Sequence, residues 1–165
     1  LAAGEPGEVC VGPALDGEWA DVYRPMLGYW NRPEASAEAL RGGLLHTGDI
    51  GSLDVDGNLR IHDRKNDLII RGGANVYPAE VERVLHEDPA VAACAVIGVA
   101  DERLGERVVA FVELMEDSVA SEDDLKSLCA EQLARYKVPD QVTFVDTFAR
   151  TPMGKIKKTL LREAI

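Results

Sequence analysis

The stretch DLIIRGGANVYPAEVE, residues 67–82, separates two parts of the sequence that differ in texture. Residues 67–71 predict a strand around the apolar residues 68–70, and the pair Gly72–Gly73 ends it. Pro78 suits the first turn of a helix, and the apolar residues after it recur at helical spacing. From this stretch onward the pattern predicts alternating strands and helices, whereas residues 1–40 are irregular and rich in glycine and proline.

The second part, residues 68–165, is predicted to fold as a compact α+β unit. Ser121 and Asp124 have the spacing of a capping box, which predicts a helix that starts there and ends near Pro139. Residues 98–106 read as a loop. Apolar runs predict further strands, and a helix is expected at the end of the sequence: strands over residues 91–97, 107–115 and 141–147, and a helix after residue 154.

The first part is β-rich but irregular. Residues 8–11 predict a short strand and residues 33–40 a short helix. Residues 44–47 look extended, and the glycines within residues 48–51 are expected to break that segment. Asp56–Gly57 lies between alternating apolar residues and predicts a hairpin. The fold class is therefore α+β, with an incomplete β-rich piece in front of the compact unit.

Composition excludes several classes of function. The 165 residues include 18 Lys+Arg and 29 Asp+Glu, for a net charge of −11. This acidic balance argues against binding to nucleic acid or to an anionic membrane surface. No apolar run approaches the roughly 20 residues that span a bilayer. The sequence starts without an initiator methionine and shows no signal peptide, so we expect a segment of a longer, cytoplasmic protein.

Metal and common catalytic motifs find little support. The three cysteines are odd in number and unclustered, and they are interpreted as reduced core thiols: Cys10, Cys94 and Cys129. The three histidines are far apart in the sequence and pair with no cysteine cluster, which disfavours zinc: His46, His62 and His86. Residues 52–63 fit part of a calcium-loop pattern, but an EF-hand needs flanking helices and the flanks here alternate like strands, which favours a β-hairpin. Nucleophile-elbow, P-loop and dinucleotide-binding motifs are absent.

Polar residues on three loops remain as candidates. Asp49, in the segment Thr47–Asp49, can accept hydroxyl groups of a ribose, because a carboxylate offers two acceptor oxygens. Arg64 can reinforce a ribose or phosphate, and Lys155 follows a glycine on a loop from which it can reach a phosphoryl oxygen. By residue type alone, each also fits an ordinary turn or surface role.

The order of the motifs carries a resemblance to a known family. Six segments follow one another along the chain: residues 4–9, 28–35, 45–49, 64–82, 96–102 and 152–156. Together they resemble the C-terminal third of the acyl-adenylate-forming superfamily. That superfamily comprises acyl- and aryl-CoA synthetases, the adenylation domains of nonribosomal peptide synthetases, and firefly luciferase. Within it, the sequence is most similar to AMP-forming acyl-CoA synthetases.

The resemblance implies a reaction in two steps that uses ATP, Mg²⁺ and CoA. A carboxylic acid attacks the α-phosphate of ATP to give acyl-AMP and pyrophosphate, and a thiol, usually of CoA, then displaces AMP. By resemblance, Asp49 holds the ribose hydroxyls, Thr47 lies in the same nucleotide-binding segment, and Arg64 supports the nucleotide. Lys155 matches the mobile lysine that bridges the carboxylate and the α-phosphate during adenylation.

The resemblance also implies a domain rotation between the two steps. Residues 64–67 are expected to form the hinge, at Asn66 or the adjacent Lys65, although the family usually has Asp or Lys at the hinge position. After rotation, Gly72 and Gly73 are expected to line the tunnel for the pantetheine arm of CoA.

The same resemblance divides the chain into three parts: residues 1–63, the hinge over residues 64–67, and residues 68–165. Residues 1–63 correspond to the β-rich tail of a large N-terminal adenylation domain, and residues 68–165 to the C-terminal lid. The phosphate loop, the Mg²⁺ carboxylate and the acyl pocket belong to the large domain, so no metal ligand is assigned in this chain. We expect the chain to be inactive without that domain, and its other partners to be the acid and CoA.

Two alternatives stay open. The chain is alternatively the C-terminal part of an adenylation domain that loads a carrier protein. It is otherwise a non-catalytic domain for assembly or regulation, against which the three retained residues argue: Asp49, Arg64 and Lys155. Acylation of Lys155 would remove its charge and silence the first step.

Overall fold

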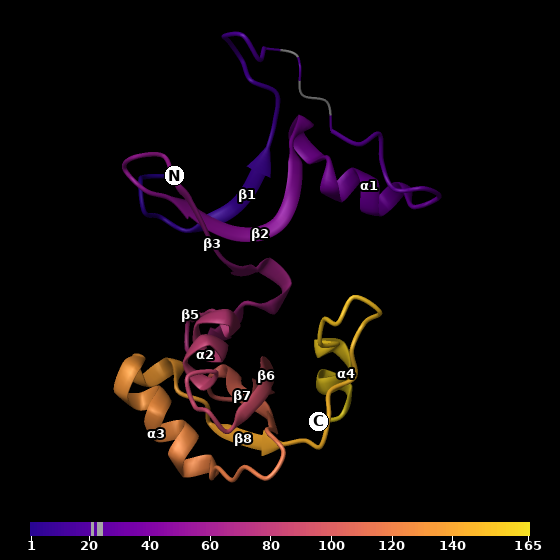
Figure 1. Cartoon of the computed structure of the whole chain (residues 1–165). Helices are drawn as coiled ribbons and strands as arrows, with labels where there is room; N and C mark the ends of the chain where they lie inside the picture. The colour runs from indigo at the N-terminus through magenta and orange to yellow at the C-terminus, as the bar shows by residue number, and fades with distance from the viewer. Residues whose placement is uncertain (21, 23–24) are drawn as a thin grey trace. The chain divides into compact units, whose positions relative to one another are not determined.

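A computed structural model describes residues 1–20, 22 and 25–165 of the chain (Figure 1). The chain divides into two compact units, Leu1–Asn66 (unit 1) and Asp67–Ile165 (unit 2). Helices and antiparallel strands occur in both, which confirms the α+β prediction. Among the described residues, no helix combines the length and the apolar character needed to cross a membrane.

Unit 1 is built on a three-stranded antiparallel sheet in the order β1-β2-β3. Its elements are β1 (Gly7–Val11), α1 (Pro33–Ala39), a 3₁₀ turn (Arg41–Gly43), β2 (Leu45–Leu53) and β3 (Leu59–Arg64). The hairpin predicted at Asp56–Gly57 is confirmed and joins β2 to β3. Of the unit's described residues, Gly51 alone is buried. Unit 1 therefore has a sheet but no apolar core of its own.

The expected break at residues 48–51 is wrong, because β2 continues through them. Gly48 has a φ of +74°, and the pairing of β2 with β3 shifts between Ile50 and Gly51. A β-carbon on Gly51 would lie 2.9 Å from the carbonyl oxygen of Arg60, which explains the glycine. The strand thus accommodates its glycines by an irregular register, since partners on both sides supply hydrogen bonds.

Unit 2 contains a five-stranded sheet in the order β5-β4-β7-β6, with β8 also paired to β7. Its elements are β4 (Ile69–Arg71), β5 (Ala74–Val76), α2 (Pro78–Leu85), β6 (Val91–Asp101), β7 (Gly105–Leu114), α3 (Glu122–Gln132), a 3₁₀ turn (Arg135–Lys137), β8 (Gln141–Phe144) and α4 (Lys158–Glu163). The pair β7–β8 is parallel and the others are antiparallel.

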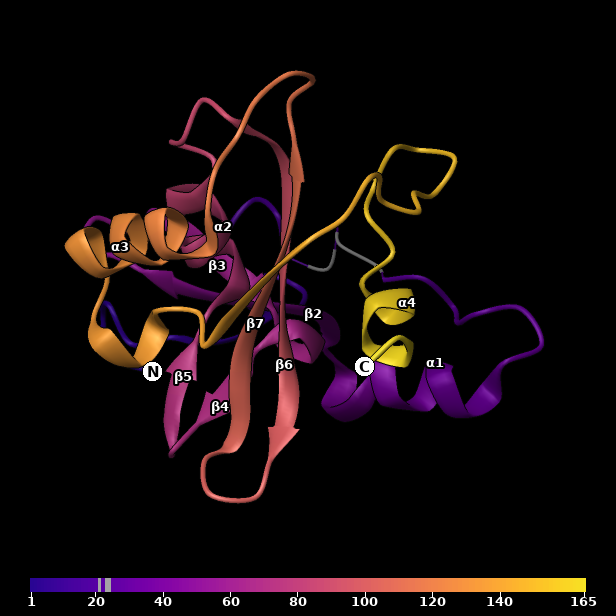
Figure 2. The ribbon, with the colours of Figure 1, turned by 90° about the horizontal axis from the view of Figure 1, so that it is seen from below.

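Both faces of this sheet are covered, as Figure 2 shows, with α2 and α3 on one side and α4 on the other. Alternate residues of β6 and β7 face opposite sides, as the period of a strand requires. Under α2 and α3 lie Val96, Val108, Ala110 and Val112, packed with Val81, Val84, Leu85, Leu125 and Cys129. On the other face Ala95, Ile97, Val109, Phe111 and Phe148 pack with Ile156 and Leu161.

Several boundaries in unit 2 differ from the expectations. β6 and β7 run to Asp101 and from Gly105, so the expected loop over residues 98–106 shrinks to a tight turn. β8 ends at Phe144, before the predicted residue 147, and α3 ends at Gln132. β5 was not predicted, because three residues show too little periodicity. The predicted capping box is confirmed at the start of α3.

Candidate functional site

In unit 1, three of the predicted nucleotide-binding residues lie together at the β2–β3 pair. Asp49 and Arg64 are direct cross-strand partners, and Arg64 Nε lies 3.0 Å from Asp49 Oδ1. Arg64 also donates from NH1 to the carbonyl oxygen of Thr47, at 3.3 Å. The Thr47 hydroxyl donates to Val9 O at 2.9 Å and accepts from the backbone N–H of Asp49 at 3.1 Å. The carboxylate is thus fixed by charge and by the backbone.

This arrangement leaves polar groups open to a ligand. The Asp49 side chain is 32% exposed and that of Arg64 is 60% exposed. A carboxylate held by one guanidinium still has acceptor sites for two hydroxyl groups. The pair can therefore bind a diol beside an anionic group, which are the two features of a nucleotide ribose and its phosphate.

Glu8 is a second polar centre of unit 1, and residue spacing did not reveal it. Its Oε2 contacts Arg41 NH2 at 2.7 Å, His46 Nδ1 at 3.1 Å and Lys65 Nζ at 3.1 Å. The hydrogen bond with His46, together with Lys65 and Arg41, outweighs desolvation and lowers the pKa of Glu8 to about 2. Glu8 is therefore ionised at neutral pH and ties β1 to Lys65, near the end of unit 1.

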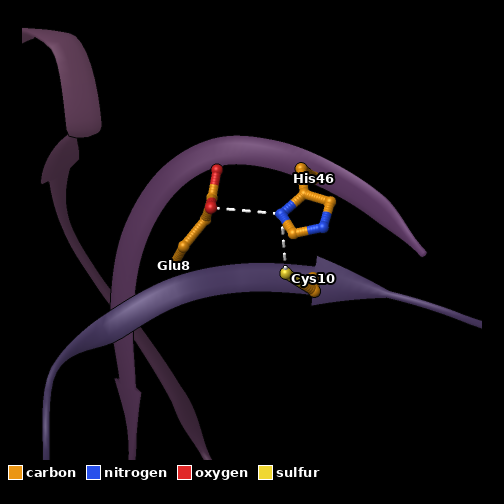
Figure 3. A group of neighbouring side chains, drawn as sticks. All are labelled: Glu8, Cys10 and His46. Atoms are coloured by element: carbon orange, nitrogen blue, oxygen red, sulfur yellow. Dashed lines mark hydrogen bonds and ion pairs between the residues drawn. The ribbon is translucent and has the colours of Figure 1, made fainter. Parts of the chain in front are cut away.

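His46 also contacts Cys10, which corrects two expectations. Cys10 Sγ lies 3.3 Å from His46 Nδ1, so a histidine does pair with a cysteine (Figure 3). Cys10 is exposed and is not a core thiol, whereas Cys94 and Cys129 are buried as expected. All three thiols are free. Glu8 and Cys10 are two residues apart on a predicted strand, which predicts that their side chains share a face. That His46 lies opposite them could not be predicted, because it depends on the register between β1 and β2.

At the boundary between the units, residues 65–67 form a 3₁₀ turn. Lys65 pairs with Glu8 in unit 1, and Asp67 accepts from Arg162 NH2 of α4 at 2.7 Å in unit 2. Among the described residues, no side-chain bond is recorded for Asn66, which lies between them. Lys65 and Asp67 are therefore each anchored by an ion pair to their own unit, whereas the Asn66 side chain has no such anchor among the described residues.

Gly72 and Gly73 form the two-residue turn between β4 and β5. Their φ angles are +58° and +83°, the signs that a type I′ hairpin requires. A β-carbon on Gly72 would come no nearer than 3.8 Å to Leu104, and one on Gly73 would meet nothing within 4 Å. Backbone conformation, and not space inside unit 2, therefore explains both glycines here.

A basic cavity of about 850 Å³ adjoins Gly72. Three arginines line it, together with Tyr136 and Asp140: Arg71, Arg103 and Arg135. Arg71 is held by Asp140 and by the carbonyl oxygens of Tyr136 and Val138. In the described part of the chain, no ion pair is recorded for the side chains of Arg103 and Arg135. No local pattern in the sequence marks this cavity, because its arginines are about thirty residues apart.

Lys155 lies on the loop between β8 and α4 of unit 2. The backbone of this loop is closed by a bond from Thr151 N to Lys155 O at 2.7 Å and one from Gly154 N to Thr151 O at 2.8 Å. Gly154 has a φ of +83°, which suits the tight turn. Lys155 is exposed. The ammonium group of Lys155 is therefore exposed on a loop whose backbone is held by hydrogen bonds.

Ion pairing distinguishes Lys155 from most other lysines. Four lysines contact carboxylates: Lys65, Lys126, Lys137 and Lys158. Across residues 1–20, 22 and 25–165, no such pair is recorded for Lys155 or Lys157. Figure 2 shows the β8–α4 loop and the β4–β5 turn on different sides of unit 2. The structure thus brings Thr47, Asp49 and Arg64 together, and leaves the loop of Lys155 apart from the glycine turn.

Comparisons with known proteins show which enzymes this chain is similar to. The model of the AMP-binding enzyme C-terminal domain matches residues 80–155. The chain is 44% identical to 2-succinylbenzoate–CoA ligase of Geobacillus kaustophilus, over 97% of this chain and 34% of that one. The chain thus spans about a third of the length of that relative, and 27% of several others.

Solved structures give the same assignment. The o-succinylbenzoate CoA synthetase of Bacillus subtilis, in complex with its acyl-adenylate intermediate, has a TM-score of 0.84 at 37% identity, over 98% of this chain and 31% of that one. An amide bond synthetase of Marinactinospora thermotolerans has a TM-score of 0.83 at 39% identity, over 100% of this chain and 32% of that one. The chain therefore belongs to the acyl-adenylate-forming enzymes, and residues 80–155 match the C-terminal domain of AMP-binding enzymes.

Proposed function

We propose that the chain is the C-terminal part of an ATP-dependent, AMP-forming acyl-CoA synthetase. The observation that carries this proposal is the ion pair of Asp49 with Arg64, buttressed by Thr47, in a chain of this family. Asp49 accepts the ribose hydroxyls of ATP, and Arg64 supports the same nucleotide while it holds the carboxylate in place.

Lys155 acts in the first half-reaction. A carboxylate oxygen of the acid forms a bond to the α-phosphorus of ATP, and the bond to the bridging oxygen of pyrophosphate breaks. Negative charge gathers on the α-phosphoryl oxygens as this happens, so a nearby ammonium group stabilises the transition state. Lys155 suits this role because its charge is not neutralised by a carboxylate among the described residues, and because its loop backbone is fixed.

The described residues do not form a fitting site for Mg²⁺. This ion prefers an octahedral set of oxygen ligands. The group of possible ligands that the described residues bring together is Glu8, Cys10 and His46, whose sulfur and nitrogen donors do not fit Mg²⁺. We place the ligands of Mg²⁺ in the N-terminal region of the complete enzyme.

Asn66 is the pivot between the two half-reactions. Lys65 and Asp67 are tied to different units, so a rotation concentrated at Asn66 keeps both ion pairs. Asparagine also tolerates unusual backbone angles better than most residues with a side chain. The anchors of the two neighbours thus favour Asn66 over Lys65 as the hinge, with residues 64–67 as the hinge segment.

CoA enters in the second half-reaction, in which its thiol sulfur bonds to the acyl carbon and AMP leaves. Gly72 and Gly73 line the path of the pantetheine arm. The basic cavity beside Gly72 suits the phosphates of the same ligand, because among the described residues no salt bridge is recorded for the side chains of Arg103 and Arg135. The three free thiols fit a reducing compartment, which favours the cytoplasm.

The N-terminal region of the same polypeptide completes unit 1. Large apolar side chains of the unit are exposed: Leu15, Trp19, Leu27 and Trp30. Unit 1 also lacks a core, so this surface is proposed to pack against the region that carries the phosphate loop and acyl pocket. The chain alone is accordingly expected to be inactive, and the identity of the acid is decided outside it.

A second candidate differs only in the acceptor. One structural relative is an amide bond synthetase, which favours an amine as the alternative acceptor to CoA. Loading of a carrier-protein thiol remains the third acceptor. All three share the first half-reaction, so the Asp49, Arg64 and Lys155 roles do not distinguish them.

The test is pyrophosphate release by the complete polypeptide, with a panel of carboxylic acids and with CoA, an amine or a carrier protein as acceptor. Acid-dependent release followed by acyl-CoA formation would support the proposal, and amide or carrier product would select the alternative. Asp49→Ala should raise the KM for ATP, whereas the matched control Asp56→Ala, on the exposed β2–β3 turn, should not. No release with any acid would favour a non-catalytic domain.

A further inference from the structure

The strands β1 and β2 bring three side chains of metal-binding type together on one face of the sheet of unit 1 (Figure 3). Cys10 is the direct cross-strand partner of His46, and Glu8 precedes Cys10 by two residues. One possible ligand atom from each lies within 4.8 Å of the other two. None of the three takes part in the proposed adenylation chemistry.

The shape of the cluster argues against a nucleophilic triad. In such a triad the imidazole contacts the nucleophile through one ring nitrogen and the carboxylate through the other. Here Cys10 Sγ and Glu8 Oε2 both approach Nδ1 of His46. One nitrogen cannot take a proton from the thiol while it donates one to the carboxylate, so a proton relay is not available.

The same convergence is what a shared cation requires. Zinc binds sulfur at about 2.3 Å and nitrogen or oxygen at about 2.0–2.2 Å in a tetrahedron, which places nitrogen about 3.6 Å from sulfur and about 3.4 Å from oxygen. The observed separations from Nδ1 are 3.3 Å to sulfur and 3.1 Å to oxygen. Movements of a few tenths of an ångström would therefore open the cluster around an ion.

We propose that Glu8, Cys10 and His46 form a binding site for one thiophilic divalent cation, with Zn²⁺ as the preferred ion. A thiolate, an imidazole and a carboxylate are all ligands of zinc, and the exposed side of Cys10 leaves a fourth position for water. On binding, the Cys10 thiol releases its proton to solvent as the sulfur–metal bond forms. His46 binds as the neutral imidazole through Nδ1, with its proton on Nε2.

Two cationic side chains compete with the metal for Glu8, and removing one of them tests whether the affinity for the metal rises as the geometry predicts. Arg41 and Lys65 both contact Glu8 Oε2, and Lys65 is 48% exposed, so its side chain can move into solvent. The other carboxylate oxygen, Oε1, has no recorded bond in the described part of the chain. Lys65→Gln should therefore tighten metal binding, because it removes a positive charge without removing a ligand.

The experiment is a titration of the reduced, metal-free complete polypeptide, in which unit 1 has its full packing, with Co²⁺, followed by displacement with Zn²⁺. We expect thiolate-to-cobalt charge-transfer absorption at one equivalent, its loss in Cys10→Ser, and its disappearance when Zn²⁺ is added. His46→Gln should weaken binding more than about 100-fold, since loss of an outer partner alone costs about 10–100-fold. The matched control His86→Gln, on the exposed end of α2, should bind as the parent chain does.

A second measurement needs no variant and so does not depend on how a variant folds. Zn²⁺ should slow alkylation of Cys10 in the parent chain at least tenfold, because a metal-bound thiolate is shielded. Absence of the cobalt absorption, its persistence in Cys10→Ser, equal weakening by His86→Gln, or unchanged alkylation would each overturn the proposal. Weaker binding by Lys65→Gln would contradict the arrangement of charges.

Discussion

The two units differ in where their order comes from. Unit 2 encloses every buried apolar side chain of the described chain, between Ile69 and Phe148. Unit 1 buries only Gly51 among its described residues and is held by backbone pairing and by polar contacts such as those of Glu8. The apolar core fixes unit 2, while the residues proposed to bind the nucleotide lie on a sheet of unit 1 that is held by ion pairs and, we propose, by packing against the N-terminal region.

The largest contrast is expected in thiol reactivity. Cys94 and Cys129 are buried in unit 2, and burial raises the pKa to about 12 for Cys94 and about 11 for Cys129. Cys10 in unit 1 is exposed. An alkylating reagent should therefore modify Cys10 of the metal-free native chain quickly. It should modify Cys94 and Cys129 at least about 100-fold more slowly, which corresponds to an opening free energy of about 3 kcal/mol. Mass spectrometry after timed alkylation measures this, and three equal rates would remove the contrast.

Core truncation is the next largest effect. Leu85 in α2 is fully buried, so Leu85→Ala should lower the free energy of unfolding by about 2–5 kcal/mol. Leu59 in β3 is 53% exposed, and Leu59→Ala should change it by no more than about 0.5 kcal/mol. Urea denaturation of the two variants compares the units directly. Similar losses for both would show that unit 1 carries packing of its own.

Helix capping gives a smaller difference. Ser121 accepts from the backbone N–H of Asp124 at the start of α3, whereas α1 in unit 1 has no side-chain cap. Ser121→Ala should cost about 1 kcal/mol. The control Ser127→Ala, at an exposed position within α3, should be neutral or slightly stabilising, since alanine favours helix interiors. Equal costs for the two variants would mean that the cap adds nothing.

The smallest expected effect is on the acid stability of unit 1. The folded-state pKa of Glu8 is lowered from 4.5 to about 2, chiefly by His46. Its ionised form therefore stabilises the fold above pH 4.5, and this contribution is lost as the pH falls from 4.5 towards 2. Comparing the unfolding of the parent chain with Glu8→Gln across this range measures it. A difference between the two that does not shrink on acidification would argue against this assignment.

Much of the fold was predictable because local patterns and tertiary packing agree in unit 2. The apolar face after Pro78 and the Ser121–Asp124 box were predictable from residue spacing. In unit 1 the Asp56–Gly57 hairpin was predictable from its turn residues alone. The course of β2 through Gly48 was not, since two neighbouring strands override its turn-like sequence. β5 escaped notice because it is a strand of three residues formed by its pairing with β4.

The candidate site was less predictable from residue types. Asp49 and Arg64 were singled out, but their ion pair depends on the register of β2 with β3. The contacts of Glu8 with residues from distant segments left no trace in spacing, and neither did the basic cavity beside Gly72. Roles in the reaction rested on the resemblance of whole motifs, which spacing alone does not supply.

The most direct test of the account separates the two half-reactions in the complete polypeptide. Pyrophosphate release from ATP and acid, and thioester formation from supplied acyl-AMP, would be measured for Lys155→Ala and for its neighbour as control, Lys157→Ala. The account predicts that Lys155→Ala loses about 10²–10³-fold or more in the first step, keeps most of the second, and that Lys157→Ala retains both. An equal loss of both steps in Lys155→Ala, or the same loss in Lys157→Ala, would contradict it.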